Sequence, residues 1–392
     1  MGYDVHAVRA RFPALAAGFA HFDGPGGSQV PDSVAAAVAA TMTSPLANRG
    51  SVTAAERGSD AIVLAARSAV ADLLGADPRG VVFGPSMTDL TMRFAATVGR
   101  TLRPGDEVVC TRLDHDANVR PWVIAAQRAG ATVRFVEPDR DTLALPPSAI
   151  AAQLTDRTRW VAVAAASNAV GTTPDVAAIV GLVHEAGARC YVDAVHAAPH
   201  RPLHLDKLGI DVLACSAYKW FGPHVGILCA PPALLEELAP DKLVPSTDAV
   251  PHRWELGTLP FEALAATTAA ADYVRGREWD EVRRHEDALM LRALDGLGAI
   301  DGVILYGEAP ERTPTLMFNV EGRTSEETAT RLAENRVAVW QGNYYAWELE
   351  RFLGLAPDGA VRAGFVHYND ADDADRLVAA VAALSPRVRS AG

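Results

Sequence analysis

The stretch RCYVDAVHAAPHRPLHLDKLGIDVLACSAYKWFG (residues 189–222) decides the fold. Two short apolar runs, 189–197 and 212–218, enclose a segment that is long enough for one helical crossover. Asp193 is the terminal polar residue of the first run, and Lys219 directly follows the second. Short apolar runs joined by helical crossovers are typical of parallel strands that are buried on both faces of a sheet.

The same alternation continues in both directions from this stretch. Helical patterns of about 10–15 residues separate the runs, which favours an α/β fold with a mainly parallel sheet. The other strand-like runs are VVFGP (81–85), EVVCTR (107–112), TVRFVEP (132–138), WVAVAAAS (160–167) and VGILCAP (225–231).

The pattern changes after about residue 260. Ala-rich helical stretches at 262–275 and 281–297 precede a strand-like TLMFNV (315–320), and a final helix is expected from about residue 370. We therefore expect a large domain at 21–262 and a smaller α+β domain at 263–392, with which the N-terminal segment 1–20 packs.

Composition narrows the classes of function. The 392 residues are 49% hydrophobic and carry a net charge of −12 without a basic cluster, which argues against a nucleic-acid partner. No apolar run approaches about 18 residues, so no membrane span is expected. The four cysteines lack metal-ligand or disulfide-framework spacing, so no metal is expected. With no signal-peptide pattern, we expect the cytoplasm.

Polar clusters follow the predicted strands. In parallel α/β sheets ligands bind beyond the carboxyl ends of the strands, so these clusters are expected to meet at one rim, although each alone could be a turn or a helix cap. The clusters lie at 86–89, 114–118, 167–168, 193–196 and 216–219.

Lys219 is the first candidate for chemistry. The chain has only three lysines, and this one follows an apolar strand, where burial would suit Schiff-base formation; a surface-loop lysine is the alternative. Asp193 would satisfy its burial by facing a pyridinium nitrogen, or it could be an N-cap. In GPSMTDL (84–90) the helix start around Ser86, Met87 and Thr88 could bind a phosphate or simply be capped.

The combined motifs resemble the aminotransferase class V family of fold-type I pyridoxal-phosphate enzymes, within it the cysteine desulfurase and selenocysteine lyase-like branch. The resemblance extends over nearly the whole chain, in HFDGPGGSQVP (21–31), NRGS (48–51), LDHDANVRPW (113–122), SNAVGT (167–172), DAVHA (193–197), SAYK (216–219), WELGT (254–258) and AVRAGFVHYN (360–369). It implies a large domain with a mainly parallel seven-stranded sheet flanked by helices, plus a smaller α+β C-terminal domain.

The resemblance also implies roles for individual residues. Lys219 would form the Schiff base with pyridoxal 5'-phosphate, His115 would stack on the cofactor ring, and Asp193 would pair with the pyridinium. Thr258 would reach the phosphate of a neighbouring subunit, which implies a homodimer, and Arg362 would grip the substrate α-carboxylate. Further cofactor contacts are expected from Met87, Thr88, Asn168, His196, Ser216 and Tyr218, and further substrate contacts from Asn168, Gly26, Gly27, Asn343 and Tyr345.

One departure bears on the reaction. Cysteine desulfurases carry a mobile-loop cysteine before the arginine motif, and the matching stretch here, QGNYYAWEL (341–349), has Tyr345 in its place. A phenol with a pKa near 10 cannot take up sulfane sulfur as a thiolate does. Packing at the domain interface is the alternative role for Tyr344 and Tyr345. His196 and Tyr218, which stand where desulfurases have Gln and His, are more like kynureninase.

We therefore expect a pyridoxal-phosphate enzyme that acts on a small L-amino acid, by lyase-type cleavage of a C–S or C–C bond at or beyond Cβ. Transamination or epimerisation at Cα is the alternative within enzymes. A catalytically silent cofactor-binding homologue is the alternative of another class.

Overall fold

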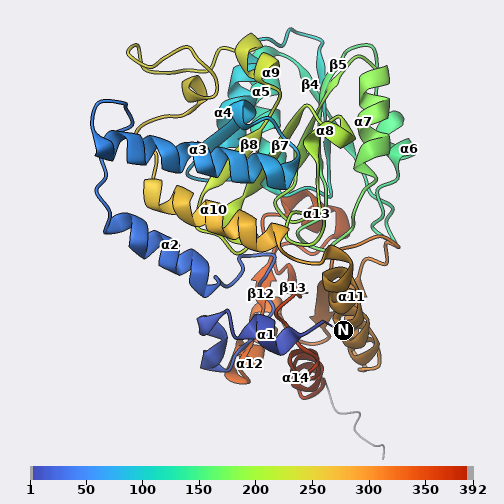
Figure 1. Cartoon of the computed structure of the whole chain (residues 1–392). Helices are drawn as coiled ribbons and strands as arrows, with labels where there is room; N and C mark the ends of the chain where they lie inside the picture. The colour runs from blue at the N-terminus through green and yellow to red at the C-terminus, as the bar shows by residue number, and fades with distance from the viewer. Residues whose placement is uncertain (1–2, 386–392) are drawn as a thin grey trace, which may run out of the picture.

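The computed structural model describes residues 3–385, and its larger part is built around a seven-stranded sheet (Figure 1). The strand order is β2-β8-β7-β6-β5-β3-β4, and β8 alone runs antiparallel to its neighbours. The prediction of a mainly parallel sheet is confirmed. The strands are β2 (Val81–Gly84), β3 (Glu107–Thr111), β4 (Thr132–Val136), β5 (Thr158–Ala164), β6 (Arg189–Asp193), β7 (Val212–Ser216) and β8 (Gly226–Cys229).

Both faces of this sheet are buried. Along β5, Val161 and Val163 belong to one hydrophobic cluster, whereas Trp160 and Ala162 belong to another on the opposite face. This alternation follows from the two-residue period of a strand. Helices cover the two faces, namely α3 (Ala54–Leu74), α4 (Met87–Gly99), α5 (Arg120–Ala129), α6 (Pro147–Ala151), α7 (Val176–Glu185), α8 (Leu205–Leu208), α9 (Pro232–Glu237) and α10 (Phe261–Arg275).

A close backbone approach positions the start of α4 beside the sheet. A Cβ atom on Gly226 of β8 would lie only 2.1 Å from the carbonyl carbon of Ser86, so a larger residue would push the two segments apart. Ser86 caps α4, accepting a hydrogen bond from the Asp89 amide at 3.1 Å. The N-terminus of α4 is therefore fixed at the same edge of the sheet as the end of β7.

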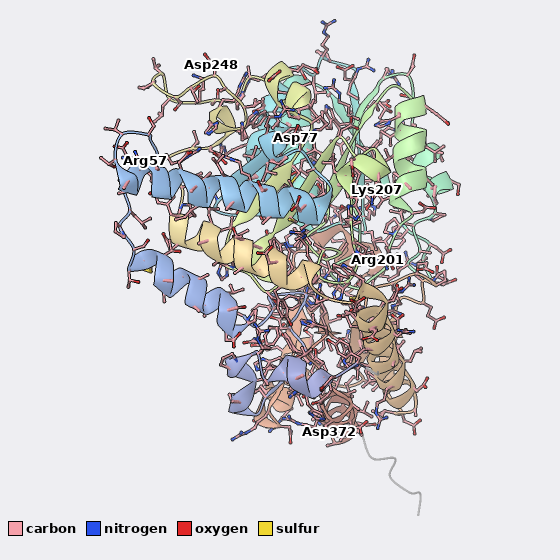
Figure 2. The ribbon with its side chains drawn as sticks, viewed as in Figure 1. Arg57, Asp77, Arg201, Lys207, Asp248 and Asp372 are labelled. Carbon is pink, nitrogen blue, oxygen red and sulfur yellow. The ribbon has the colours of Figure 1, made fainter. Side chains whose placement is uncertain are left out.

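The C-terminal part contains a separate antiparallel sheet in the order β12-β13-β10-β9. Leu316 and Phe318 of β10 pack with Leu377 and Val381 in a hydrophobic cluster of their own. The elements are α11 (Trp279–Gly298), β9 (Val303–Tyr306), β10 (Thr315–Val320), α12 (Ser325–Glu334), β11 (Val337–Ala338), β12 (Trp340–Gly342), α13 (Trp347–Leu353), β13 (Ala360–Gly364) and α14 (Ala371–Ala382). Figure 2 labels charged residues of both parts, such as Lys207 on α8 and Asp372 on α14.

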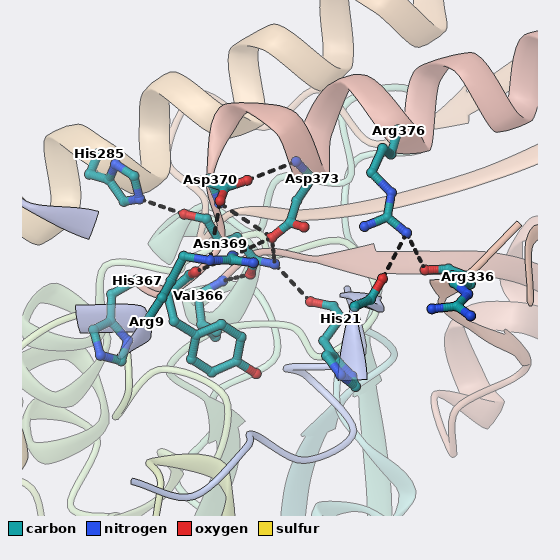
Figure 3. Close-up of polar contacts among 12 residues, drawn as sticks. Arg9, His21, His285, Arg336, Val366, His367, Asn369, Asp370, Asp373 and Arg376 are labelled. Carbon is teal, nitrogen blue, oxygen red and sulfur yellow. Dashed lines mark hydrogen bonds and ion pairs between the residues drawn. The ribbon is translucent and has the colours of Figure 1, made fainter. Parts of the chain in front are cut away.

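The N-terminal segment lies against the C-terminal part. β1 (Ala20–His21) pairs in parallel with β11, and Arg9 of α1 (Val5–Arg9) forms ion pairs with Asp370 and Asp373 at 3.2 and 2.8 Å (Figure 3). α10 packs against α3 and α2 (Asp32–Met42). The domain division at residues 20/21 and 262/263 stays a proposal. Among residues 3–385, no helix has the length and hydropathy that a membrane span requires.

Candidate active site

The carboxyl ends of the parallel strands border a cavity of about 600 Å³, which continues into a narrower inner part. Residues from all five predicted polar clusters line the inner part, and it also contacts the loop at Pro25. The inner lining includes Met87, Thr88, His115, Asn168, Asp193, His196, Ser216, Tyr218 and Lys219. The outer part is bordered by Asp23, Gly26, Met92, Arg120, Asn168, Trp340, Tyr344, Tyr345 and Arg362.

Lys219 follows β7 in a single 3-10 turn and is turned toward the N-terminal loop. Its Nζ donates hydrogen bonds to the carbonyl oxygens of Pro25 and Gly26, the latter at 2.8 Å. Burial, together with the positive charge of the nearby Arg362, lowers the pKa of Lys219 to about 7, although Asp23 acts in the opposite direction. About half of this amine is therefore neutral near pH 7, as a nucleophile or proton carrier requires.

Asp193 is the last residue of β6, on the strand beside β7, and is buried. Its Oδ1 accepts a hydrogen bond from the Val195 amide at 2.8 Å. Burial raises the pKa of this carboxyl to about 6, although the Val195 hydrogen bond and the charge of Lys219 lower it. A carboxylate held in this way gains by pairing with a positive group that enters the cavity.

His115 follows β3 and lines both parts of the cavity. Its Nδ1 accepts a hydrogen bond from the Ala117 amide at 3.0 Å, and its ring stacks on Tyr345 with centroids 5.3 Å apart. Burial lowers the pKa of His115 to about 3, and the charges of Lys219 and Arg362 add to this effect. The imidazole is therefore neutral, and it borders both parts of the cavity.

Arg362 comes from β13 of the smaller sheet and is 3% exposed. Its two terminal nitrogens donate to the backbone oxygen of Asn168 and to Oδ1 of Asp23, each at 3.0 Å. Its Nε is buried without a hydrogen-bond partner among residues 3–385. The guanidinium also lies over the ring of Tyr344, 4.7 Å from its centroid. The cation is thus well placed for a carboxylate, which would compete with Asp23.

The segment between β12 and α13 closes the outer part. Tyr344 and Tyr345 both have positive φ angles, 48° and 59°, which are uncommon for residues other than glycine. The Tyr344 carbonyl accepts a hydrogen bond from Asn168 Nδ2 at 2.9 Å, and the Tyr345 carbonyl accepts one from the Asp116 amide at 2.7 Å. These contacts hold a strained turn over the cavity.

Some predicted residues lie elsewhere. Asn343 does not line either part of the cavity; its Oδ1 instead accepts a hydrogen bond from the Tyr345 amide at 2.9 Å, so it shapes the turn. Gly27 does not line either part of the cavity either, and an added Cβ there would be 3.4 Å from the Tyr218 ring. Thr258 is exposed and is not among the lining residues of this chain's cavity.

Other lining residues were missed by the sequence reasoning. Asp23 lies inside the quoted HFDGPGG motif, but its ion pair with Arg362 joins positions 339 residues apart. Trp340, which lies directly before the QGNYYAWEL stretch, also borders the outer part. Met92 lies one helical turn beyond Thr88 on α4, so helical spacing was its available signal, whereas Arg120 lies inside the quoted motif 113–122.

The four cysteines lie in the large sheet, and none of them lines the cavity. Cys110, Cys190, Cys215 and Cys229 are buried in β3, β6, β7 and β8. Burial raises the pKa of every one of these thiols, that of Cys215 to about 12. Buried thiols of this kind are inert.

The pieces fit a pyridoxal-phosphate site. An amine of lowered pKa and a buried carboxylate follow adjacent strands, a neutral imidazole forms one wall, and Oδ1 of Asn168 is buried without a partner among residues 3–385. This fold and site define a fold-type I pyridoxal-phosphate enzyme.

Comparisons with known proteins identify the family. The family model for aminotransferase class V matches residues 20–377, and the chain belongs to this family. A probable cysteine desulfurase of Pseudomonas aeruginosa is 34% identical, over 95% of this chain and 96% of that protein. An uncharacterised protein of Mycobacterium tuberculosis is also 34% identical, over 98% and 100%.

Solved structures agree with this assignment. The cysteine desulfurase CsdA of Escherichia coli superposes with a TM-score of 0.88 at 28% identity and covers 97% of this chain and 98% of its own. The cysteine desulfurase of Thermococcus onnurineus NA1 gives a TM-score of 0.91 at 25% identity, with 97% of both chains covered. The cofactor prediction and the fold prediction are both confirmed.

Proposed function

We propose that this pyridoxal-phosphate enzyme cleaves a small L-amino acid at or beyond Cβ, breaking a C–S or C–C bond without forming a protein-bound persulfide. One observation carries the proposal. Lys219, Asp193 and Arg362 surround a single cavity, whereas all four thiols of the chain are buried in the sheet and none of them lines the cavity. Tyr345 borders the outer part, where the resemblance to desulfurases would place a cysteine.

The cofactor, when bound, supplies an electron sink that stabilises negative charge on the substrate carbon atoms. Lys219 is the residue that we propose to hold it covalently, and Asp193 the one that keeps its ring nitrogen protonated. Met87, Thr88 and Ser216 are proposed for the phosphate: the Met87 amide already lies 3.4 Å from Ser216 Oγ at the start of α4.

Arg362 is proposed to bind the substrate α-carboxylate. Its partner Asp23 is partly exposed, so an incoming carboxylate can displace it more easily than it could displace a fully buried partner. The neutral form of Lys219, favoured by burial and by the positive charge of Arg362, would then carry a proton to or from Cα. His115 is proposed to stack on the face of the cofactor ring, and its imidazole is neutral there.

Thr258 supports a homodimer in this proposal. It is exposed and outside the cavity of its own chain, as a residue that serves the active site of a partner subunit must be. Sedimentation of the holoenzyme tests the dimer. Complementation between two inactive variants, Thr258→Ala and Lys219→Ala, tests the shared site, because a mixed dimer would regain one intact site.

The reaction is tested by incubating the holoenzyme with a panel of L-amino acids. Pyruvate or alanine together with a released fragment supports the proposal. Transfer of the amino group to an oxo acid, or a racemised substrate, would overturn it in favour of chemistry confined to Cα. No turnover with bound cofactor would indicate a silent homologue. Persulfide on the protein after incubation with L-cysteine would instead support the desulfurase reaction.

A further inference from the structure

His196 follows β6 and forms part of the inner cavity wall, where it is buried. Two threonine hydroxyls meet the same ring nitrogen: Nε2 lies 2.9 Å from Thr315 Oγ1 and 3.0 Å from Thr313 Oγ1. Thr315 is the first residue of β10, so this contact joins the loop after β6 to the smaller sheet.

Counting hydrogens decides which group donates. Burial and the neighbouring positive groups hold the pKa of His196 well below its usual value, so the ring is neutral and has one N–H and one lone pair. Thr313 Oγ1 has another acceptor, the carbonyl oxygen of Gly171 at 3.3 Å. Within residues 3–385, the hydroxyl of Thr315 is buried with Nε2 of His196 as its one hydrogen-bond partner.

We infer that Thr315 is a positioning residue that donates its hydroxyl hydrogen to Nε2 of His196 and so keeps the ring proton on Nδ1. If Nε2 instead carried the proton, the Thr315 hydroxyl hydrogen would be buried without an acceptor, which is the more costly arrangement. Nδ1 makes no hydrogen bond within the described residues, and His196 lines the inner cavity. The proton on Nδ1 is then a donor for an acceptor atom of the bound cofactor, and this last step rests on the proposed function.

The segment that carries the two threonines is fixed on both sides. The Thr313 amide donates to the Gly171 carbonyl at 2.8 Å, and a Cβ on Gly171, whose φ is +75°, would lie 2.4 Å from the Thr313 oxygen. On the other side, Thr315 is paired with Gly364 and Met317 with Arg362. The smaller sheet therefore orients His196 and presents Arg362 through adjacent strands.

The inference is tested by ¹⁵N NMR of the histidine side chains in the cofactor-loaded protein, with His196 assigned by a His196→Asn variant. The two neutral tautomers differ in which nitrogen has the shift of a protonated one. Wild type is expected to show protonated Nδ1. Thr315→Val should shift the population toward protonated Nε2, Thr315→Ser should restore the wild-type tautomer, and Thr313→Val, the matched control, should leave it unchanged.

Cofactor retention gives an independent readout. Thr315→Val is expected to weaken pyridoxal-phosphate binding about threefold to tenfold, the effect of one misplaced hydrogen bond, whereas Thr315→Ser binds as wild type does. Protonated Nε2 in the wild-type protein would overturn the inference even if Thr315→Val does not fold. An unchanged tautomer in a folded Thr315→Val variant would also overturn it. A chain that takes up no cofactor at all would defeat the proposed function, while the tautomer measurement would still decide the inference.

Discussion

The inner and outer walls of the cavity are built in different ways. The inner groups lie at the carboxyl ends of adjacent strands of the large sheet, whose residues are buried on both faces: Asp193 ends β6, Ser216 ends β7 and Lys219 follows β7. The outer wall contains Tyr344 and Tyr345 on a turn with positive φ angles, and Tyr345 is 70% exposed. We propose that the sheet fixes the groups that do chemistry, whereas the turn adjusts which substrates reach them. Substitutions should therefore have graded effects from the inside outward.

The largest effect is expected from Lys219→Ala. Removing the amine that we propose to hold the cofactor and carry protons should lower kcat by at least about 1000-fold. The measurement combines turnover of the amino acid found in the panel with mass spectrometry of the borohydride-reduced protein, which should lose its cofactor adduct. Lys207→Ala is the matched control, because Lys207 is exposed on α8. Turnover near the wild-type rate in Lys219→Ala would refute the proposed role of Lys219 in the reaction.

Arg362→Gln should have the second-largest effect. Loss of charged hydrogen bonds to a carboxylate should lower kcat/KM about 100-fold. Because the positive charge of Arg362 lowers the pKa of Lys219, its removal should raise that pKa above about 7 and move the rise of activity with pH to higher pH. Arg351→Gln, at an exposed position of α13, is the control. An unchanged pH profile would contradict the coupling between the two walls.

Substitutions in the turn at Tyr344 and Tyr345 should have weaker effects. Tyr345→Ala removes the ring that stacks on His115 and should raise KM about threefold to tenfold with little change in kcat. Tyr345→Phe keeps the ring and should retain the wild-type KM. Steady-state kinetics on one amino acid separate the two parameters. A loss of kcat comparable with that of Lys219→Ala would mean that Tyr345 takes part in the chemical step, and it would contradict the proposed difference between the inner and outer walls.

This contrast also limits what the sequence could predict. The positions of Asp193 and Lys219 follow from local patterns, because an apolar strand places the next polar residue at the rim wherever the strand is parallel. The Asp23–Arg362 ion pair and the turn at Tyr344 depend on how the two sheets pack together. Short-range patterns in the sequence do not predict that packing. Asn343 is a second example. Its motif position suggested a substrate contact, whereas its side chain accepts a hydrogen bond from the Tyr345 amide and so stabilises the turn.

The smallest effect is expected from thiol-modifying reagents, which we predict leave the activity of the folded protein unchanged. With a pKa of about 12, Cys215 is about one part in 100,000 thiolate at pH 7, and burial also raises the pKa values of Cys110, Cys190 and Cys229. Iodoacetamide should leave native activity unchanged and add no label, and all four thiols should react after unfolding. One label per native chain with loss of activity would mean that a thiol is accessible at the cavity. A reaction through a protein-bound persulfide would then again be possible.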